Sequence, residues 1–524
     1  MVGVPGRSKG CHTCRRRRKG CDLQRPECAQ CKRLGLKCDG YERKTTFVHH
    51  GAVSVFQLTI AASSTEARKT VKSGKKRNTT VDKVSTIALP EKLAKSAYEC
   101  SYLALFFEMY QPGSTASSVS DYAGAGGLSL TSWLVGVQCR QIYHGSPLLQ
   151  KSVMAICLST LGQRMQNRQM TEEGLKAYTV ALRGMSVALT RNNGKLPPDE
   201  AMLAATRCLS LYEVFFGTDA SNIPGQARAW NRHRFGEMAL LSARDPSMHK
   251  DGWAHDLLAD GRMSCTIAGI VTRKDTMFSR EEWKTVPWSG TNRKTAMDLL
   301  LDIFVDIPKL LVDLDSLTIS PSTTKSKEAE AQSSLLERCE DMLEELEFWL
   351  ERHAPTKWRE VSPRRGRTGY EACHYPCSDN PTADDVAEAH IMCLFWAMQI
   401  KVRKVAVFTN FLGSEDESLP PEELEELVPY AQAILQTAPI FLTPGAGIAG
   451  CHLSVFPLTC AVRLFMTMSG TGATQVGTYI RELLSNRGRE TGLPVWEFVK
   501  SLGILSLPKT DPILDGTRLA GCVY

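Results

Sequence analysis

Residues 11–41 read CHTCRRRRKGCDLQRPECAQCKRLGLKCDGY, and the cysteine spacing in this stretch decides which fold it can form. A C-x2-C-x6-C pattern occurs twice, seventeen residues apart, at Cys11, Cys14 and Cys21 and again at Cys28, Cys31 and Cys38. A C-x2-C turn directs two thiolates at one metal, and tetrahedral zinc takes four soft ligands. Three cysteines per copy are too few for one site each, so six serve two zinc ions only if two thiolates bridge both metals. The spacing therefore predicts a binuclear zinc cluster.

Over residues 11–41 the sequence resembles the Zn2Cys6 binuclear cluster proteins of fungi. The resemblance extends beyond the cysteines to the basic run Arg15–Lys19, the Cys21-Asp22 pair, Pro26 and the Gly40-Tyr41 pair. It implies a small DNA-binding domain over residues 8–41, with two short helices around two zinc ions. It also implies a ligand set in which Cys11 and Cys28 bridge, Cys14 and Cys21 complete one zinc site, and Cys31 and Cys38 complete the other.

Five consecutive basic residues separate the second and third cysteines, and they distinguish two interpretations of the cluster. Metals commonly replace a hydrophobic core in domains of this size, so the zinc ions could serve only to staple the fold. A loop that is only held in place by zinc would not require five adjacent positive charges that repel one another. The basic run therefore favours DNA binding. A short helix starting near Cys11 would carry Arg17 and Arg18 at its far end. Because Arg matches the O6 and N7 acceptors of guanine, we expect Arg18 first and Arg17 second to contact bases. The resemblance implies a CGG triplet as the target.

Other basic residues around the cysteines are better suited to phosphate contacts, which fix register and supply salt-dependent affinity. These residues are Arg15, Arg16, Lys19, Lys32 and Arg33. Gly20 departs from the family pattern, because a Lys is frequent at that position, and one backbone contact is therefore in doubt. His12, His49 and His50 are not expected to bind zinc, since six thiolates complete both coordination shells.

Charge is distributed unevenly along the 524 residues, whose formal net charge is +7. Residues 1–44 carry +9, residues 45–95 carry +6, and the remainder carries −8. The contrast between a basic N-terminal region and a mildly acidic remainder indicates that the N-terminal region binds a polyanion. We expect a soluble, intracellular protein without membrane contact, because no apolar run approaches a membrane span and the N-terminus lacks the apolar core of a signal peptide. In that reducing setting the twelve cysteines outside the cluster are interpreted as small buried hydrophobes.

Residues 42–95 are polar and patchily basic without sustained periodicity, and they are predicted to be a flexible linker. Relatives often carry a coiled coil here, but no heptad pattern persists. A homodimer would then pair through the large domain, and the alternative is a monomer on DNA. The runs Arg15–Lys19 and Lys75–Arg77 are candidate nuclear-import signals, so we expect the protein in the nucleus.

Residues 96–524 are predicted to form one large all-α domain. Ser146 and Pro147 mark one helix start, Asp199 a second and Thr382 a third, and the apolar residues of 335–350 repeat at intervals of three and four. The domain weakly resembles the fungal-specific transcription factor regulatory domain, partly through Trp230, His233 and Gly236, which we interpret as a packed helix face. The resemblance implies a regulatory or effector-sensing role, and nothing in the spacing shows a ligand pocket.

Three further patterns are weighed and set aside. Gly445, Gly447 and Gly450 spell G-x-G-x-x-G, but no βαβ frame surrounds them, so a turn between helices is expected. Cys373, His374 and Cys377 suggest a small metal site, but only one C-x3-C pair is present and no second pair accompanies it, so a loop is expected. The acidic segment 415–427 has the composition of an activation segment, although an acidic first turn of a helix is the simpler interpretation.

No convincing acid/base pair, nucleophile or phosphate cradle is present, so we expect no enzymatic activity. The sequence predicts a zinc-dependent, sequence-specific transcription regulator of RNA polymerase II genes in a fungus, controlling a metabolic or secondary-metabolite gene cluster. Its expected partners are double-stranded DNA, a second copy of the chain and the transcription machinery or co-regulators. A small-molecule effector is left open.

Overall fold

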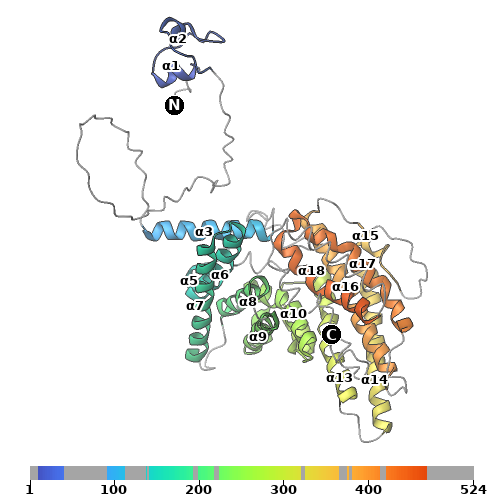
Figure 1. Ribbon diagram of the computed structural model, residues 1–524. Coiled ribbons are helices and arrows are strands. Elements are labelled where there is room, and N and C mark those ends of the chain that lie inside the picture. The colour runs from blue at the N-terminus through green and yellow to red at the C-terminus, as the bar shows by residue number, and fades with distance from the viewer. Residues whose placement is uncertain are drawn as a thin grey trace. The chain divides into compact units, whose positions relative to one another are not determined.

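The chain divides into two compact units, Met1–Thr86 and Ile87–Tyr524 (Figure 1). The computed structural model describes residues 10–40, 91–111, 137, 141–192, 199–217, 223–319, 325–364, 375–376, 381–412 and 421–468. Some predictions lie outside the described residues, including those for most of the linker, the Lys75–Arg77 run and the Cys373–Cys377 pair.

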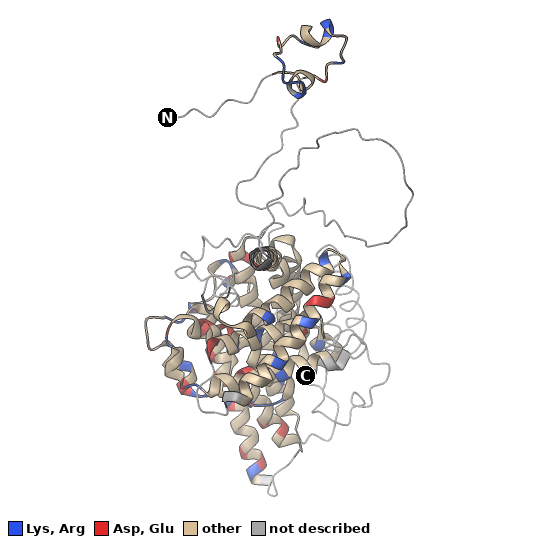
Figure 2. Cartoon of the chain, turned by 90° about the vertical axis from the view of Figure 1, so that its left-hand side faces the viewer, with Lys and Arg blue, Asp and Glu red and all other residues tan. Residues whose placement is uncertain are grey.

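The first unit contains two five-residue helices, α1 (His12–Arg16) and α2 (Ala29–Arg33), which lie against each other. Thr13 on α1 ties this helix to the end of the second cysteine repeat. Its hydroxyl donates to the Lys37 carbonyl at 3.0 Å and accepts from the Asp39 amide at 3.0 Å. Figure 2 shows basic residues on both short helices, whereas the second unit carries both signs of charge. The first unit is thus small, basic and held by side chains that reach across the repeat.

The described residues of the second unit form helices joined by turns and irregular segments, and no strand occurs among them. Its α-helices are α3 (Glu91–Tyr110), α5 (Gln141–Gly145), α6 (Pro147–Arg164), α7 (Arg168–Asn192), α8 (Glu200–Phe215), α9 (Ile223–Ser242), α10 (Gly252–Thr272), α11 (Glu281–Thr285), α12 (Ala296–Phe304), α13 (Ile307–Ile319), α14 (Lys325–Arg352), α15 (Thr356–Arg359), α16 (Ala383–Asn410), α17 (Val428–Thr437) and α18 (Gly447–Thr467). Short 3-10 helices connect them: η4 (Pro246–His249), η5 (Met277–Ser279), η6 (Val286–Trp288), η7 (Pro421–Leu427), η8 (Ala438–Leu442) and η9 (Pro444–Ala446). The predicted helical character of the large region is confirmed.

Helix starts in this unit follow the capping residues seen in the sequence. Ser146 accepts a hydrogen bond from the Leu149 amide at 3.3 Å, with Pro147 in the first turn. Asp199 accepts from the Met202 amide at 2.7 Å to begin α8. Thr382 and Asp385 form a capping box at the start of α16. Each side-chain oxygen satisfies a backbone N–H that the helix leaves without a partner.

The core of the second unit is built around α16, which packs on α14, α17 and α18. Phe395 and Trp396 on α16 are fully buried, and the predicted amphipathic helix over residues 335–350 lies within α14. The segment Pro444–Thr467 has the length and composition to cross a membrane, with a mean hydropathy of 1.5, but 72% of its most apolar window is buried inside the unit. The expectation that no run is that apolar is wrong here, because α18 is apolar on all sides as a core helix.

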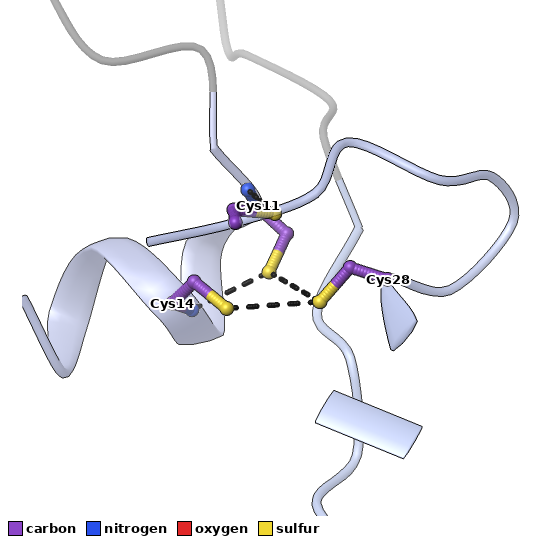
Figure 3. Close-up of side chains that lie close together, drawn as sticks. Cys11, Cys14 and Cys28 are labelled. Atoms are coloured by element: carbon purple, nitrogen blue, oxygen red, sulfur yellow. Dashed lines mark hydrogen bonds between the residues drawn. The ribbon is translucent and has the colours of Figure 1, made fainter. Parts of the chain in front are cut away.

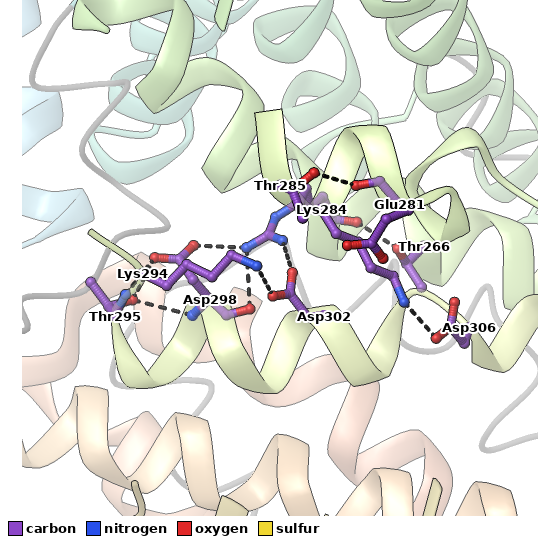
Figure 4. Close-up of polar contacts among 10 residues, drawn as sticks. Thr266, Glu281, Lys284, Thr285, Lys294, Thr295, Asp298, Asp302 and Asp306 are labelled. Carbon is purple, nitrogen blue, oxygen red and sulfur yellow. Dashed lines mark hydrogen bonds and ion pairs between the residues drawn. The ribbon is translucent and has the colours of Figure 1, made fainter. Parts of the chain in front are cut away.

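Buried ion pairs connect α10 to α12 (Figure 4). Arg262 donates to Asp302 at 2.6 Å and to Asp298 at 2.8 Å, and its guanidinium lies 4.1 Å from the centre of the Trp288 ring. Lys294 donates to the second oxygen of Asp302. Because these charges are paired, burial of the Arg262 side chain costs far less than burial of an isolated charge would.

Two elements differ from the sequence-based expectation. Helix α3 begins at Glu91, inside the segment 42–95 predicted as a linker. The G-x-G-x-x-G stretch is only partly a turn, because Gly445 lies in η9 and Gly450 lies inside α18. A Cβ at Gly450 would approach the Phe441 carbonyl oxygen to 2.6 Å, so this glycine permits close helix packing. Leu424 and Leu427 of the acidic segment lie in η7 and are buried, which agrees with the interpretation of this segment as the first turn of a helix.

Candidate metal centre and nucleic-acid interface

The six cysteines of the repeat come together in the first unit, with four fully buried and two half-buried. The Sγ atom of Cys28 lies 3.6 Å from that of Cys11 and 3.6 Å from that of Cys14, and these three side chains point toward one another in Figure 3. The Sγ atoms of Cys11 and Cys31 are 3.8 Å apart. All six thiols are free rather than joined in disulfides.

These sulfur atoms form two overlapping sets of four, and within each set all sulfurs lie within 4.8 Å of one another. One set holds Cys11, Cys14, Cys21 and Cys28, and the other holds Cys11, Cys28, Cys31 and Cys38. A tetrahedral zinc site with Zn–S bonds of about 2.3 Å has sulfur–sulfur edges of about 3.8 Å, which the shorter distances here approach. The cysteines therefore fit two tetrahedral sites that share Cys11 and Cys28.

The electrostatics of the cluster also suit a cation. Burial raises the pKa of the Cys11, Cys28 and Cys31 thiols to about 12, because a thiolate there loses its water. The pKa of Cys38 is lowered, because the backbone amides of Cys28 and Gly40 donate to its sulfur. A bound divalent cation supplies the charge that turns such thiols into thiolates.

The backbone positions the sulfurs in the same way in both repeats. The Cys14 amide donates to the Cys11 sulfur at 3.3 Å, and the Cys31 amide donates to the Cys28 sulfur at 3.3 Å. Each bond closes the first turn of a short helix, α1 or α2, and places two sulfurs of a C-x2-C pair on one side. This geometry explains why the spacing of two intervening residues suits a metal site.

Both short helices also end alike. The Lys19 amide donates to the Cys14 carbonyl at 3.0 Å, and the Leu36 amide donates to the Cys31 carbonyl at 3.0 Å. The residue before each donor has left-handed backbone, with φ 52° at Arg18 and φ 64° at Gly35. This is the Schellman type of helix end, in which glycine usually takes the left-handed position. Arg18 occupies it in the first repeat.

The basic residues predicted to contact DNA, Arg15 apart, lie on the surface of the first unit. Arg17, Arg18 and Lys19 are exposed beyond the end of α1, and Lys32 and Arg33 are exposed on α2. The side chain of Arg15 lies outside the described part.

Two of the predicted phosphate contacts already have side-chain partners. Arg16 pairs with Asp39 at 2.6 Å, with side-chain exposures of 73% and 39%. Arg33 donates to Gln30 at 2.8 Å.

Two residues shape the site although the sequence analysis gave neither of them a role. Thr13 is buried and makes the two hydrogen bonds that join the repeats. Asp22 accepts from the Ala29 amide at 2.9 Å and so holds the start of α2. Comparing the two repeats could have indicated a structural role for Asp22, because Asp39 stands at the equivalent position seventeen residues later. No comparable signal exists for Thr13, since Gln30 takes its place in the second repeat.

Comparison with known proteins agrees with this geometry. Residues 9–46 match the family described as the Fungal Zn(2)-Cys(6) binuclear cluster domain. The chain is 59% identical over 39 residues to the aspercryptin biosynthesis cluster-specific transcription regulator atnN of Emericella nidulans, which covers 7% of this chain and 6% of that protein. It is 50% identical over 48 residues to the pestheic acid cluster transcriptional regulator 3 of Pestalotiopsis fici, covering 9% and 8% of the two chains. No solved structure gives a match.

The N-terminal unit therefore contains a Zn2Cys6 binuclear cluster domain, a fungal DNA-binding module that binds two zinc ions. The relatives share less than a tenth of their length with this chain, so the similarity describes this module alone.

Proposed function

We propose that this protein is a zinc-dependent, sequence-specific regulator of transcription that acts in the nucleus on RNA polymerase II genes. The observation that carries the proposal is the run of basic side chains at the end of α1, directly beside a binuclear cysteine cluster. The names of both relatives concern regulators of biosynthetic gene clusters. The proposed targets are accordingly the genes of a fungal secondary-metabolite cluster, and no enzymatic activity is proposed.

In the proposed cluster Cys11 and Cys28 bridge the two zinc ions, because each belongs to both sets of four sulfurs. Cys14 and Cys21 complete one zinc site, and Cys31 and Cys38 complete the other. Zinc supplies the cross-link that a module too small for a hydrophobic core requires. The proposed organisation of the chain is this domain over residues 8–41, a linker that ends before α3 begins at Glu91, and a regulatory domain over the helical remainder. The regulatory domain is proposed to recruit the transcription machinery or co-regulators.

Recognition of DNA is proposed to begin at the end of α1. Arg18 and Arg17 read a CGG triplet in the major groove through guanine O6 and N7. Phosphates are contacted by Arg15, Arg16, Lys19, Lys32 and Arg33. The Arg16–Asp39 pair does not prevent this, because an exposed pair contributes about 0–1 kcal/mol and a phosphate can replace the carboxylate.

A second copy of the chain is proposed as a partner, paired through the helical unit. Leu175, Leu182 and Leu189 on α7 lie at seven-residue intervals and are 45%, 37% and 49% exposed. Such a row is the pattern of a coiled-coil seam, and a two-fold axis would present the same row from the other copy.

Oligomeric state tests this pairing. Sedimentation of the full chain over a range of concentrations should show a dimer that Leu182→Lys weakens. Val180→Lys, a substitution of another exposed apolar residue roughly on the opposite face of α7, should leave the dimer intact. A monomer at all concentrations, or equal effects of both variants, would count against the pairing.

One experiment tests the proposed function directly. The full-length zinc-loaded chain is used to select duplexes from a random library, with Cys28→Ala as the control that lacks the cluster. We expect enrichment of CGG-containing duplexes by the native chain and none by the variant. Equal, sequence-independent recovery by both proteins would instead support a cluster that only staples the fold.

A further inference from the structure

A partly open pocket of about 180 Å³ lies in the helical unit, with walls from α8, α9, α10, α16 and α18. Most of its described wall is apolar, with Leu211, Met263, Ile267, Leu394 and Phe456 among the lining residues. An engineered cavity of about 150 Å³ with similar walls holds a benzene molecule. The volume here therefore suits a single aromatic ring with a small substituent.

The charged side chains of the wall already have partners within the chain. These side chains are Arg207, Arg234, Asp260, Lys401 and Arg463. Arg207 and Arg234 both donate to the buried carboxylate of Glu237, and the other three also interact within the protein. A charged ligand would lose its hydration here without gaining a counter-charge that is still available. The wall therefore favours a neutral ligand.

Two histidines, His390 on α16 and His452 on α18, add polar groups to the wall. Burial, and then the neighbouring His452, lower the pKa of His390 to about 3, and burial lowers the pKa of His452 to about 4. Both rings are therefore neutral at pH 7. His390 is 1% exposed, and its Nδ1 has no hydrogen-bond partner among the described residues. Such a buried polar group gains from a ligand that supplies the missing bond.

A hydroxyl group is the ligand group that best suits this imidazole. A neutral imidazole has one N–H donor and one acceptor nitrogen, and a hydroxyl can bond to either, whereas an ether or carbonyl oxygen only accepts. Leu394 follows His390 by one turn of α16, and both residues line the pocket. Residues four apart share one face of a helix, so a ring packed on Leu394 brings its substituent toward His390.

We propose that this pocket binds a neutral phenol, with its hydroxyl hydrogen-bonded to His390 and its ring between Leu394 and the apolar residues of α10 and α18. The site lies within the helical unit and requires neither zinc nor DNA. It would let the helical unit respond to a phenolic metabolite independently of the cysteine cluster.

The test uses the full zinc-loaded chain at pH 7 and measures binding by calorimetry and by the shift in thermal unfolding. The probes at millimolar concentration are phenol and 4-methylphenol, each compared with its methyl ether, and 4-methylbenzoate as a charged analogue. At least one phenol should bind and raise the unfolding temperature. Its ether should bind roughly fivefold or more weakly because it cannot donate a hydrogen bond. The benzoate should bind more weakly than 4-methylphenol because the cations of the wall already have partners.

Three outcomes would overturn the proposal: failure of both phenols to bind, equal binding of phenol and ether, or tighter binding of 4-methylbenzoate than of 4-methylphenol. Because the measurement involves no DNA, its result is independent of whether the chain regulates transcription.

Variants then locate the ligand. His390→Phe keeps a flat ring but removes both nitrogens, and it should abolish the preference for the phenol over its ether. His249→Phe is the matched control, because His249 is also fully buried with an unpartnered ring nitrogen but does not line the pocket. Unchanged discrimination in His390→Phe, in a protein that still unfolds cooperatively, would place the ligand elsewhere and overturn the assignment.

A second variant keeps the assignment testable if His390→Phe does not fold. Ile267 lines the pocket and is only partly buried, so its side chain can be enlarged without displacing the core. Ile267→Trp should obstruct the pocket and weaken the phenol and its ether alike. Unchanged affinity for both in Ile267→Trp would show that they bind outside this pocket.

Discussion

The two cysteine repeats of the N-terminal unit have the same backbone geometry but different side chains on their surfaces. Both have the amide-to-sulfur bond at the helix start and the same hydrogen bond at the helix end. After the second cysteine, however, the first repeat continues with four arginines, Lys19 and Gly20, whereas the second continues with Lys32, Arg33, Leu34, Gly35, Leu36 and Lys37. The metal scaffold is thus duplicated, and only one copy carries the charge expected for reading DNA.

Backbone strain also differs between the two cysteine repeats. Left-handed residues occur at equivalent positions, Arg18 with Gly35 and Leu23 with Gly40. Glycine adopts this conformation freely, while another L-residue pays roughly 1–2 kcal/mol. The first repeat therefore holds two costly residues where the second holds none. Strain that persists inside a cross-linked fold commonly marks a functional position, which agrees with the role proposed for Arg18.

The largest expected effect comes from removing a sulfur that both halves share. Cys28→Ala should reduce bound zinc from two ions per chain to none and unfold the cluster, since structural zinc contributes about 10–16 kcal/mol of folding free energy in comparable peptides. Cys38→Ala removes a sulfur found in only one set of four and should retain zinc in the other site. Native mass spectrometry counts the ions. Equal zinc loss in the two variants would argue against shared ligands.

The next largest effect is expected at Arg18, where a substitution can separate backbone strain from DNA recognition. Arg18→Gly should weaken discrimination between CGG-containing and scrambled duplexes by about 1–3 kcal/mol, because a bidentate guanine contact is lost. The same change should not destabilise the DNA-free domain, because glycine suits the φ of 52° at this position.

Gly35→Ala is the matched control in the second repeat. A Cβ at Gly35 meets nothing within 4 Å, so the cost is confined to its φ of 64° and should lower stability by about 1 kcal/mol. Discrimination between duplexes should be unchanged. Anisotropy titrations and thermal unfolding measure the two quantities, and a loss of discrimination in Gly35→Ala would remove the functional difference between the repeats.

The comparison of the two repeats also shows how much of the structure could be predicted from the sequence. The repeated spacing predicted the meeting of six sulfurs, because ligand number and tetrahedral geometry leave few alternatives. The helix caps at Ser146 and Thr382 were equally readable, since they depend on neighbouring residues. Thr13 and Arg262 were not, because their roles depend on groups distant in sequence, such as Asp39 for the first and Asp298 for the second. Local chemistry is visible in a sequence, whereas a contact across the fold is not.

A smaller effect is expected from the basic residues of the second repeat. Lys32→Ala should lower affinity for all duplexes alike and reduce the slope of log affinity against log salt by about one, because it removes one phosphate contact. Arg17→Ala should instead change the order of preferred sequences. Titrations at several salt concentrations with two duplexes distinguish these outcomes, and a change of sequence preference in Lys32→Ala would contradict the assignment.

The smallest effect is expected where the first repeat lacks a charge that the second has. Gly20 stands seventeen residues before Lys37, and a Cβ at Gly20 would meet nothing within 4 Å. Gly20→Lys should therefore fold normally and add one phosphate contact, steepening the salt slope by about one without altering sequence preference. Gly20→Ala controls for the loss of glycine and should leave the slope unchanged. If Gly20→Lys and Gly20→Ala bind DNA equally at low salt, then this edge of the first repeat does not face the phosphate backbone, and α1 enters the groove in an orientation other than the one proposed.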